Sequence, residues 1–600
     1  MLKLIVSRFL LVFLSIEAIL QEPTIYQRRQ KLSAIRNGVD LGGAYETMLG
    51  RITGQGGKKA RLGMAVLMWI SHARRPLQVD EICHAVAIRI GSNDLDNDDI
   101  PAISTLLDCC QGLVTVDTGS STVRLIHFTL LEHLCTHPDL FNRAHSTMAE
   151  TCLTYLNFQR IKDLPAGPSS DPRGTPFLEY SSFYWGTHMR IELSDCAKAL
   201  AVQLLDQFDS HISAQSLWKT IESELGFSSY SSDKPFSALH CISYFGIPEV
   251  TNTLIEMNRW DVNQRDGLGM TPLIWAARYG RDEVVRLFLR NKHIHPDQRD
   301  ASYGRTALSW AAGNGHEGVV RMFLESQFVS PGSVGCRWGM AARVADLLFR
   351  GKYIDPNSSC ESGQTPLSVA AENSHEGIVS LLLERKDVNP GTQDTEYGQT
   401  PLSLAAENGH EGIVKLLLER SDVNPDSSSK SGRTPLSWAA EKGHQGIVNL
   451  LLERKAVNPD TPDMTYGLTP LSWAAGNGHE GIMRLLLGRE DVNPNTPDTE
   501  YGLTPLSWAA MNGHEGTVKL LLGRSVNPDT LDTMYSQTPL SWAAEMGHER
   551  VVKLLLGRKD VNPNSCSKSG ETPLTLAARK GHGRVVELLQ ARLPLHTPGI

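Results

Sequence analysis

One pattern returns along more than half of the chain at an interval of 34 or 35 residues. It reads T-P-L-x-x-A-A, then G-H, then an apolar run that closes with D-V-N. Ten positions open the pattern and number the repeats 1 to 10: Ser237, Thr271, Thr306, Thr365, Thr400, Thr434, Thr469, Thr504, Thr538 and Thr572. The one irregular interval, 59 residues, lies between repeats 3 and 4. Such a period is typical of solenoids, in which each repeat buries its apolar side against its neighbours.

Repeat 6 shows how the pattern specifies local structure. Thr434 can cap a helix through its side-chain oxygen, and Pro435 suits the first helical position. Gly443 suits the left-handed residue at which that helix ends. The apolar residues at 447, 448, 451 and 452 form the stripe of a second helix. The sequence therefore predicts two short helices in each repeat.

The pattern closely resembles the ankyrin repeat over residues 231–591, with residues 592–600 as a tail. This resemblance implies a mainly α-helical solenoid that binds a protein partner on its concave face. We expect about eleven repeats, because the irregular interval contains one more repeat in degenerate form, "CRWGMAARVADLLFRGKYIDPN". That degenerate repeat, near 332–359, is expected to put a local kink in the row.

A Ser seven residues before a His recurs in most repeats, as in Ser472 and His479. Helices pack about 8–10 Å apart, so histidines of successive repeats cannot share one metal ion. A hydrolase needs one such pair with an orienting acid, and not eight equivalent copies. We therefore interpret the pairs as structural and expect no catalytic residue, metal or cofactor. The recurring tryptophans give way to Val369 and Leu404 in two repeats, which favours packing between repeats over a ligand groove.

The variable positions of the repeat are the candidate partner-binding residues. The first set stands three residues before the opening Thr, at the hairpin tips: Tyr303, Tyr397, Tyr466, Tyr501 and Tyr535. The second set stands directly before the Thr: Arg305, Gln399, Arg433, Leu468 and Leu503. The third set follows the Ala pair: Glu407, Glu441, Met511 and Glu545. The ankyrin resemblance implies that these places line the concave face. The tyrosines could instead support their own turns.

Residues before the repeats follow a different plan. Residues 60–88 read as two amphipathic helices with a turn at Pro76, and residues 100–134 as a helix, a hairpin turning at Gly119, and another helix. Helices followed by a small hairpin describe a winged helix. These stretches resemble the winged helix that follows the NACHT domain in fungal NOD-like receptors, also known from GPI inositol-deacylase-like proteins. We expect a helical remnant of a NACHT-associated region at 1–55, the winged helix at 56–160, and a linker and helical connector at 161–230.

A NACHT ATPase requires a phosphate-binding loop of the form G-x-x-x-x-G-K-[ST]. The nearest stretch, "GRITGQGGKKARLG", has Ile52 and Lys59 where Gly and Ser or Thr are required. We therefore expect no ATP hydrolysis, and a NACHT switch supplied in trans or lost. The resemblance implies the sensor end of a receptor used in signalling or non-self recognition. The alternative is a truncated or mis-predicted fragment of a full NACHT ATPase; an enzyme in its own right is a third possibility without a supporting motif.

Composition narrows the partners and the compartment. A net charge of −8 argues against a general nucleic-acid binder, although a winged helix with Lys58 and Arg61 could contact DNA. Ten cysteines without regular spacing fit reduced thiols, so we expect a cytoplasmic protein. The charge-free stretch between Arg8 and Glu17 is too short to span a membrane, and residues 5–20 fit one face of an amphipathic helix.

Overall fold

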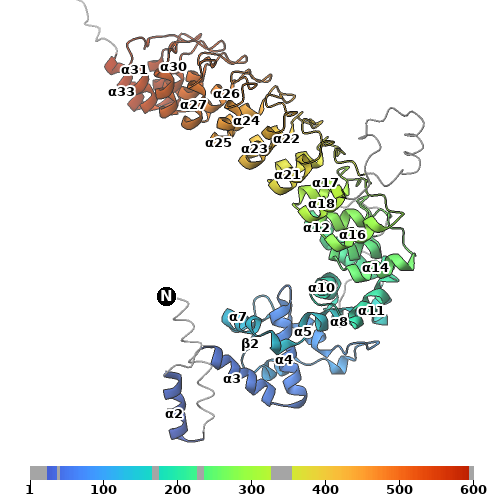
Figure 1. The fold of residues 1–600 in the computed structure, drawn as a ribbon. Helices are drawn as coiled ribbons and strands as arrows, with labels where there is room; N and C mark the ends of the chain where they lie inside the picture. The colour runs from blue at the N-terminus through green and yellow to red at the C-terminus, as the bar shows by residue number, and fades with distance from the viewer. Residues whose placement is uncertain (1–22, 37–40, 165–173, 226–235, 326–353, 593–600) are drawn as a thin grey trace, which may run out of the picture. The chain divides into compact units, whose positions relative to one another are not determined.

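The computed structural model describes residues 23–36, 41–164, 174–225, 236–325 and 354–592 (Figure 1). The chain divides into two compact units, residues 1–276 and 277–600, and the boundary falls inside one helix. The helix expected over residues 5–20 lies outside the described residues, as do residues 165–173 and 226–230 of the expected linker and connector.

The winged helix occupies the first compact unit. Its elements are α4 (Gly57–His72), β1 (Leu77–Gln78), α5 (Val79–Ala87), α6 (Ile103–Cys109), β2 (Val114–Asp117), β3 (Thr122–Leu125) and α7 (Phe128–Thr136). The hairpin of β2 and β3 forms as expected, with Val116 opposite Val123. A third strand joins it in the antiparallel order β1-β3-β2. Two residues of strand are too few for a period-2 pattern, so β1 could not be read from the sequence.

The same unit contains an aromatic core and further helices. They are α2 (Ile25–Arg36), α3 (Leu41–Gly54), α8 (Ala144–Leu156), α9 (Gln159–Lys162), α10 (Leu178–Ile191), α11 (Asp195–Leu205) and α12 (Ile212–Leu225). Helix α8 packs along α10. Buried rings of Trp69, Phe177 and Tyr180 meet edge to face or stacked, with centroids 5.5–5.8 Å apart. Beside them His145 Nδ1 lies 2.8 Å from His188 Nδ1, a partly buried contact between α8 and α10.

Each of the ten repeats forms two helices, as the pattern predicts. Those of repeats 1 to 5 are α13 (Ala238–Phe245), α14 (Pro248–Met257), α15 (Pro272–Arg278), α16 (Asp282–Arg290), α17 (Ala307–Gly313), α18 (Glu317–Glu325), α20 (Pro366–Glu372), α21 (Glu376–Leu383), α22 (Pro401–Asn408) and α23 (Glu411–Glu419). Those of repeats 6 to 10 are α24 (Pro435–Lys442), α25 (Gln445–Leu452), α26 (Pro470–Gly476), α27 (Glu480–Leu487), α28 (Pro505–Met511), α29 (Glu515–Leu522), α30 (Pro539–Met546), α31 (Glu549–Leu556), α32 (Pro573–Lys580) and α33 (Gly583–Arg592). Within the second compact unit, first helices pack on first helices and second helices on second helices (Figure 1).

The irregular interval does not interrupt the row. Helix α17 of repeat 3 packs directly on α20 of repeat 4, and α18 packs on α21. The Glu361 amide donates to the Tyr303 carbonyl at 2.8 Å, a hydrogen bond that every tyrosine-bearing hairpin makes with the next hairpin. Repeats 3 and 4 are thus direct neighbours. The degenerate repeat is expected near 332–359. Most of that stretch lies outside the described residues.

Candidate partner-binding site

The recurring Ser and His belong to two separate contacts. Ser472 is buried, and its hydroxyl lies 3.1 Å from that of Thr469, which caps the same helix by accepting from the Ser472 amide. His479 instead donates its Nε2–H to the Glu441 carbonyl of the preceding repeat at 2.8 Å. Eight histidines make this bond at 2.8–3.0 Å: His316, His375, His410, His444, His479, His514, His548 and His582. The histidines therefore join one repeat to the previous one.

A buried aspartate that sequence analysis missed organises each tyrosine hairpin. Asp498 Oδ1 accepts from the Tyr501 amide at 2.6 Å, and Oδ2 accepts from the Trp508 indole at 3.0 Å. The equivalent aspartates are Asp300, Asp394, Asp463 and Asp532. The signal was present, because an Asp stands six residues before the Thr in each of these repeats.

The five tyrosines both pack and remain accessible. Four of them are 41–60% exposed: Tyr303, Tyr397, Tyr466 and Tyr535. The rings of Tyr303, Tyr501 and Tyr535 contact the tryptophan of their own repeat edge to face, with centroids 5.8–6.5 Å apart. Their backbones are fixed by the aspartate and by the next hairpin. These side chains are therefore presented from a rigid backbone with part of each ring open to contact.

Many of the other predicted residues pair with one another. The residue before the Thr reaches the glutamate eight positions later: Gln399 bonds Glu407 at 2.6 Å, and Gln537 bonds Glu545 at 2.9 Å. Arg433 forms the corresponding ion pair with Glu441. Repeat 4 has the same pair in Gln364 and Glu372, at 2.9 Å. Arg305 stacks on Trp310 at 5.1 Å from the ring centroid.

Repeats 7 and 8 lack this polar pair, because other residues stand at both of its positions. Leu468 and Leu503 replace the Gln or Arg, and Gly476 and Met511 replace the Glu. Both leucines are buried, at 5% and 3% exposure, so they are not the exposed contact residues that the sequence predicts.

An uncharged groove of about 380 Å³ opens between repeats 7 and 8, and Leu468 is among its lining residues. Its lining residues are Tyr466, Leu468, Ser472, Trp473, Gly476, Asn477, Tyr501, Trp508 and Asn512. Trp275 and Trp310 are buried between repeats as expected, whereas Trp473 and Trp508 are only partly buried. In this part of the array the packing role therefore leaves part of each of the two rings open to contact. The structure brings Tyr466, Leu468 and Tyr501 together here.

A second hollow on the same side, of about 400 Å³, lies between repeats 9 and 10. Tyr535 and Glu545 line it together with Gln537, so two more of the predicted residues meet here. Its charged groups are largely paired: Arg579 bridges Glu571 at 2.9 Å and Glu545 at 3.4 Å. Unlike the groove between repeats 7 and 8, this hollow is polar.

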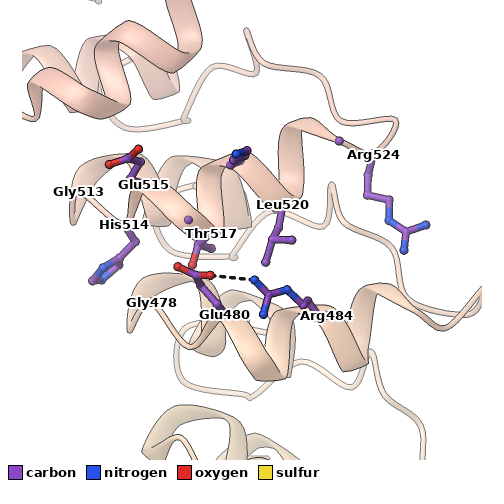
Figure 2. A pocket seen from close by; sticks show the side chains of 12 residues that line it. Gly478, Glu480, Arg484, Gly513, His514, Glu515, Thr517, Leu520 and Arg524 are labelled. Carbon is purple, nitrogen blue, oxygen red and sulfur yellow. Dashed lines mark hydrogen bonds and ion pairs between the residues drawn. The ribbon is translucent and has the colours of Figure 1, made fainter.

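Another hollow, of about 890 Å³, lies between α27 and α29 and contains none of the predicted residues (Figure 2). Figure 2 shows Arg484 reaching Glu480, an ion pair of 3.0 Å. Glu515 pairs with Arg550 of the next repeat at 3.5 Å. The Thr517 hydroxyl is buried without a hydrogen-bond partner, where the neighbouring repeats carry Ile482 and Val551.

Two other kinds of feature are absent from the described residues. No described helix is long and apolar enough to span the bilayer. The described part of the chain also holds no group of three or more His, Cys, Asp or Glu side chains arranged to bind a metal ion.

Comparison with known families gives two matches. Residues 46–146 match the family "GPI inositol-deacylase, winged helix domain". Residues 239–332, 335–428, 387–463, 412–498, 455–532 and 506–594 match the family "Ankyrin repeats (3 copies)". No curated protein matches the chain. Arrays of this kind offer extended surfaces for protein partners. Because the ankyrin matches span more than half of the chain and the two-helix repeats stack as that family requires, the chain belongs to the ankyrin-repeat family.

Proposed function

We propose that the array recognises a protein partner on its concave face, formed by the hairpin tips and the first helices. The observation that supports this proposal best is the change of residues at repeats 7 and 8. There the internal polar pair is replaced at both ends, and aromatic side chains line the opening that results. Aromatic residues dominate the energetics of protein interfaces, and a rigid backbone lowers the entropic cost of binding.

The candidate contact residues divide into two groups under this proposal. Tyr466 and Tyr501 would contact the partner directly, together with the indole faces of Trp473 and Trp508. The paired residues, such as Gln399 with Glu407, would set the polar rim of the same face. Leu468 would act by keeping the groove open and free of charged groups.

We further propose that this recognition belongs to signalling of the NOD-like-receptor type in the cytoplasm. The support is the order of the two matched families, a winged helix followed by ankyrin repeats. A NACHT ATPase would then act in trans. A test is titration of the full chain with a fluorescent ATP analogue: we expect no saturable binding. Binding of one analogue per chain would favour the alternative, a fragment of a NACHT ATPase.

Site-specific photo-crosslinking in native lysate tests the binding face. The photoreactive amino acid p-benzoylphenylalanine replaces Tyr466 in the full chain, and in a matched control it replaces Lys519. Both positions are exposed, but Lys519 lies on a second helix. We expect one partner protein to be cross-linked from position 466 and absent from position 519. Equal products from both positions, or a product from position 519 alone, would contradict binding at the first-helix face.

A further inference from the structure

The array itself shows which side chain fits between successive tryptophans of the first helices. The Arg433 guanidinium carbon lies 3.8 Å from the ring centroid of Trp438 and 4.1 Å from that of Trp473 in the next repeat. Arg278 of repeat 2, which stands where repeat 6 has Glu441, also lies close to a tryptophan of the next repeat, 4.0 Å from the centroid of Trp310. Planar guanidinium groups stack on aromatic faces and lose little hydration when they do so.

One repeat further along, the stacked arginine is missing. Leu468 stands where repeat 6 has Arg433, and Gly476 stands where repeat 6 has Glu441. The guanidinium and its carboxylate are both replaced by smaller uncharged groups. The groove of about 380 Å³ between Trp473 and Trp508 occupies the corresponding place.

The wall of this groove carries negative charge behind the rings. The Trp473 indole donates to Asp463 at 3.1 Å, and the Trp508 indole donates to Asp498 at 3.0 Å. Both carboxylates are only 3% exposed, and among the ion pairs of the described residues neither has a cationic partner. A carboxylate that accepts from the indole N–H increases the electron density of the ring face. Low solvent access also preserves the field of the two aspartates. The groove is thus uncharged at its surface and complementary to a cation.

We propose that this groove binds the guanidinium group of an arginine side chain of the protein partner, stacked between Trp473 and Trp508. The proposal rests on the proposed function and specifies the chemistry of that same site. Lysine fits less well, because its ammonium is compact, strongly hydrated and unable to stack. Tyr466 and Tyr501 flank the opening and would contact the stem of the arginine.

The test titrates the full chain with short blocked peptides and follows tryptophan fluorescence and calorimetric heat. The probes are acetyl-Gly-Arg-Gly-amide and its citrulline, lysine and proline counterparts; citrulline keeps the shape of arginine without the charge. We expect saturable binding of the arginine peptide and at least about tenfold weaker binding of the other three.

Two variants place the binding event in the groove. Leu468→Arg combined with Gly476→Glu rebuilds the internal pair of repeat 6 and fills the groove. Trp508→Leu removes one wall and introduces the residue that repeat 5 carries at this place, Leu404. Each is expected to weaken binding of the arginine peptide at least about tenfold. Lys519→Ala, on a second helix, should leave the affinity unchanged.

Three results would overturn the proposal: equal affinity for arginine and citrulline, unchanged affinity in both groove variants, or no saturable binding of any peptide. Saturable binding of the proline peptide instead would show that the groove takes an uncharged extended segment. Each of these results leaves the photo-crosslinking at Tyr466 intact as a separate test, so failure of the arginine assignment is distinguishable from failure of the proposed function.

Discussion

Replacing Asp498 by Asn is expected to destabilise repeat 8 by about 3 kcal/mol. The carboxylate accepts five hydrogen bonds, three on Oδ1 and two on Oδ2. The donors are the amides of Glu500, Tyr501, Gly502 and Leu503 and the indole of Trp508, at 2.6–3.1 Å. The substitution keeps the size of the side chain and replaces one acceptor oxygen by an NH₂ group.

The magnitude follows from the donors that lose their acceptor. With the amide oxygen on the three-bond side, the Leu503 amide and the Trp508 indole face NH₂. Each buried donor left without a partner costs about 1–3 kcal/mol. Water entering the exposed end of the hairpin recovers part of that sum. In the opposite amide orientation the NH₂ group faces the three donors on the Oδ1 side. Three donors then lose their acceptor, and the loss of stability is larger.

Hydrogen exchange measured by mass spectrometry is the appropriate assay, because a repeat array opens locally and does not unfold in one step. We expect faster exchange in α28 and α29, with α22 and α23 unchanged. Glu500→Gln is the matched control, since it removes one charge from an exposed position of the same hairpin and should cost less than about 0.5 kcal/mol. A loss below about 1 kcal/mol for Asp498→Asn, or one equal to the control, would refute the role assigned to this carboxylate.

Three further changes test other parts of the structure. Thr517→Val should raise the unfolding free energy of repeat 8 by about 1–2 kcal/mol, because it removes a buried hydroxyl without a partner; a loss of stability in urea titration would show that the hydroxyl is satisfied. Gly443→Ala should cost more than Gly581→Ala: both residues have φ near +84°, but only at Gly443 would the new Cβ lie 2.8 Å from the histidine ring of the next repeat. Equal shifts in Tm would contradict that contact. Burial lowers the pKa of His145 to about 4 and of His188 to about 3, so the folded state binds fewer protons than the unfolded state as pH falls below about 6.5. Stability of the first compact unit should therefore fall between pH 6.5 and 4, by up to about 1.4 kcal/mol per pH unit for each histidine, and His145→Gln should reduce this slope in acid titrations followed by near-UV circular dichroism.

The features predicted from sequence are those whose causes lie close together in the chain. The Thr cap, the helix-ending Gly and the apolar stripe each act within a few residues, so the period alone predicts the two-helix repeat. The hairpin of the winged helix was predictable for the same reason. Strand β1 forms only because β3 is there to pair with it, and no local pattern marks it.

The sequence predicts which positions belong to the candidate site, but it does not predict how their side chains are arranged in space. That Gln399 would bond Glu407 was readable in principle, because the two positions change together: Leu468 accompanies Gly476, and Leu503 accompanies Met511. The groove depends instead on contacts between repeats, which one repeat cannot reveal. The aspartate of each tyrosine hairpin is hard to recognise from sequence because other acidic residues stand close to it in the hairpins.

Repeats 3 and 4 are neighbours in the stack although a long connection joins them in the sequence. The connection there is 24 or 25 residues longer than the others, yet lengthening a loop costs only about 0.6 kcal/mol for each doubling. The helix contacts and hairpin hydrogen bonds that join these two repeats do not pass through that connection. A protease cut between residues 325 and 354 would therefore leave two pieces held together by their shared interface. The same place is where foreign sequence could be inserted, or the chain re-joined in a new order, with the array still assembled.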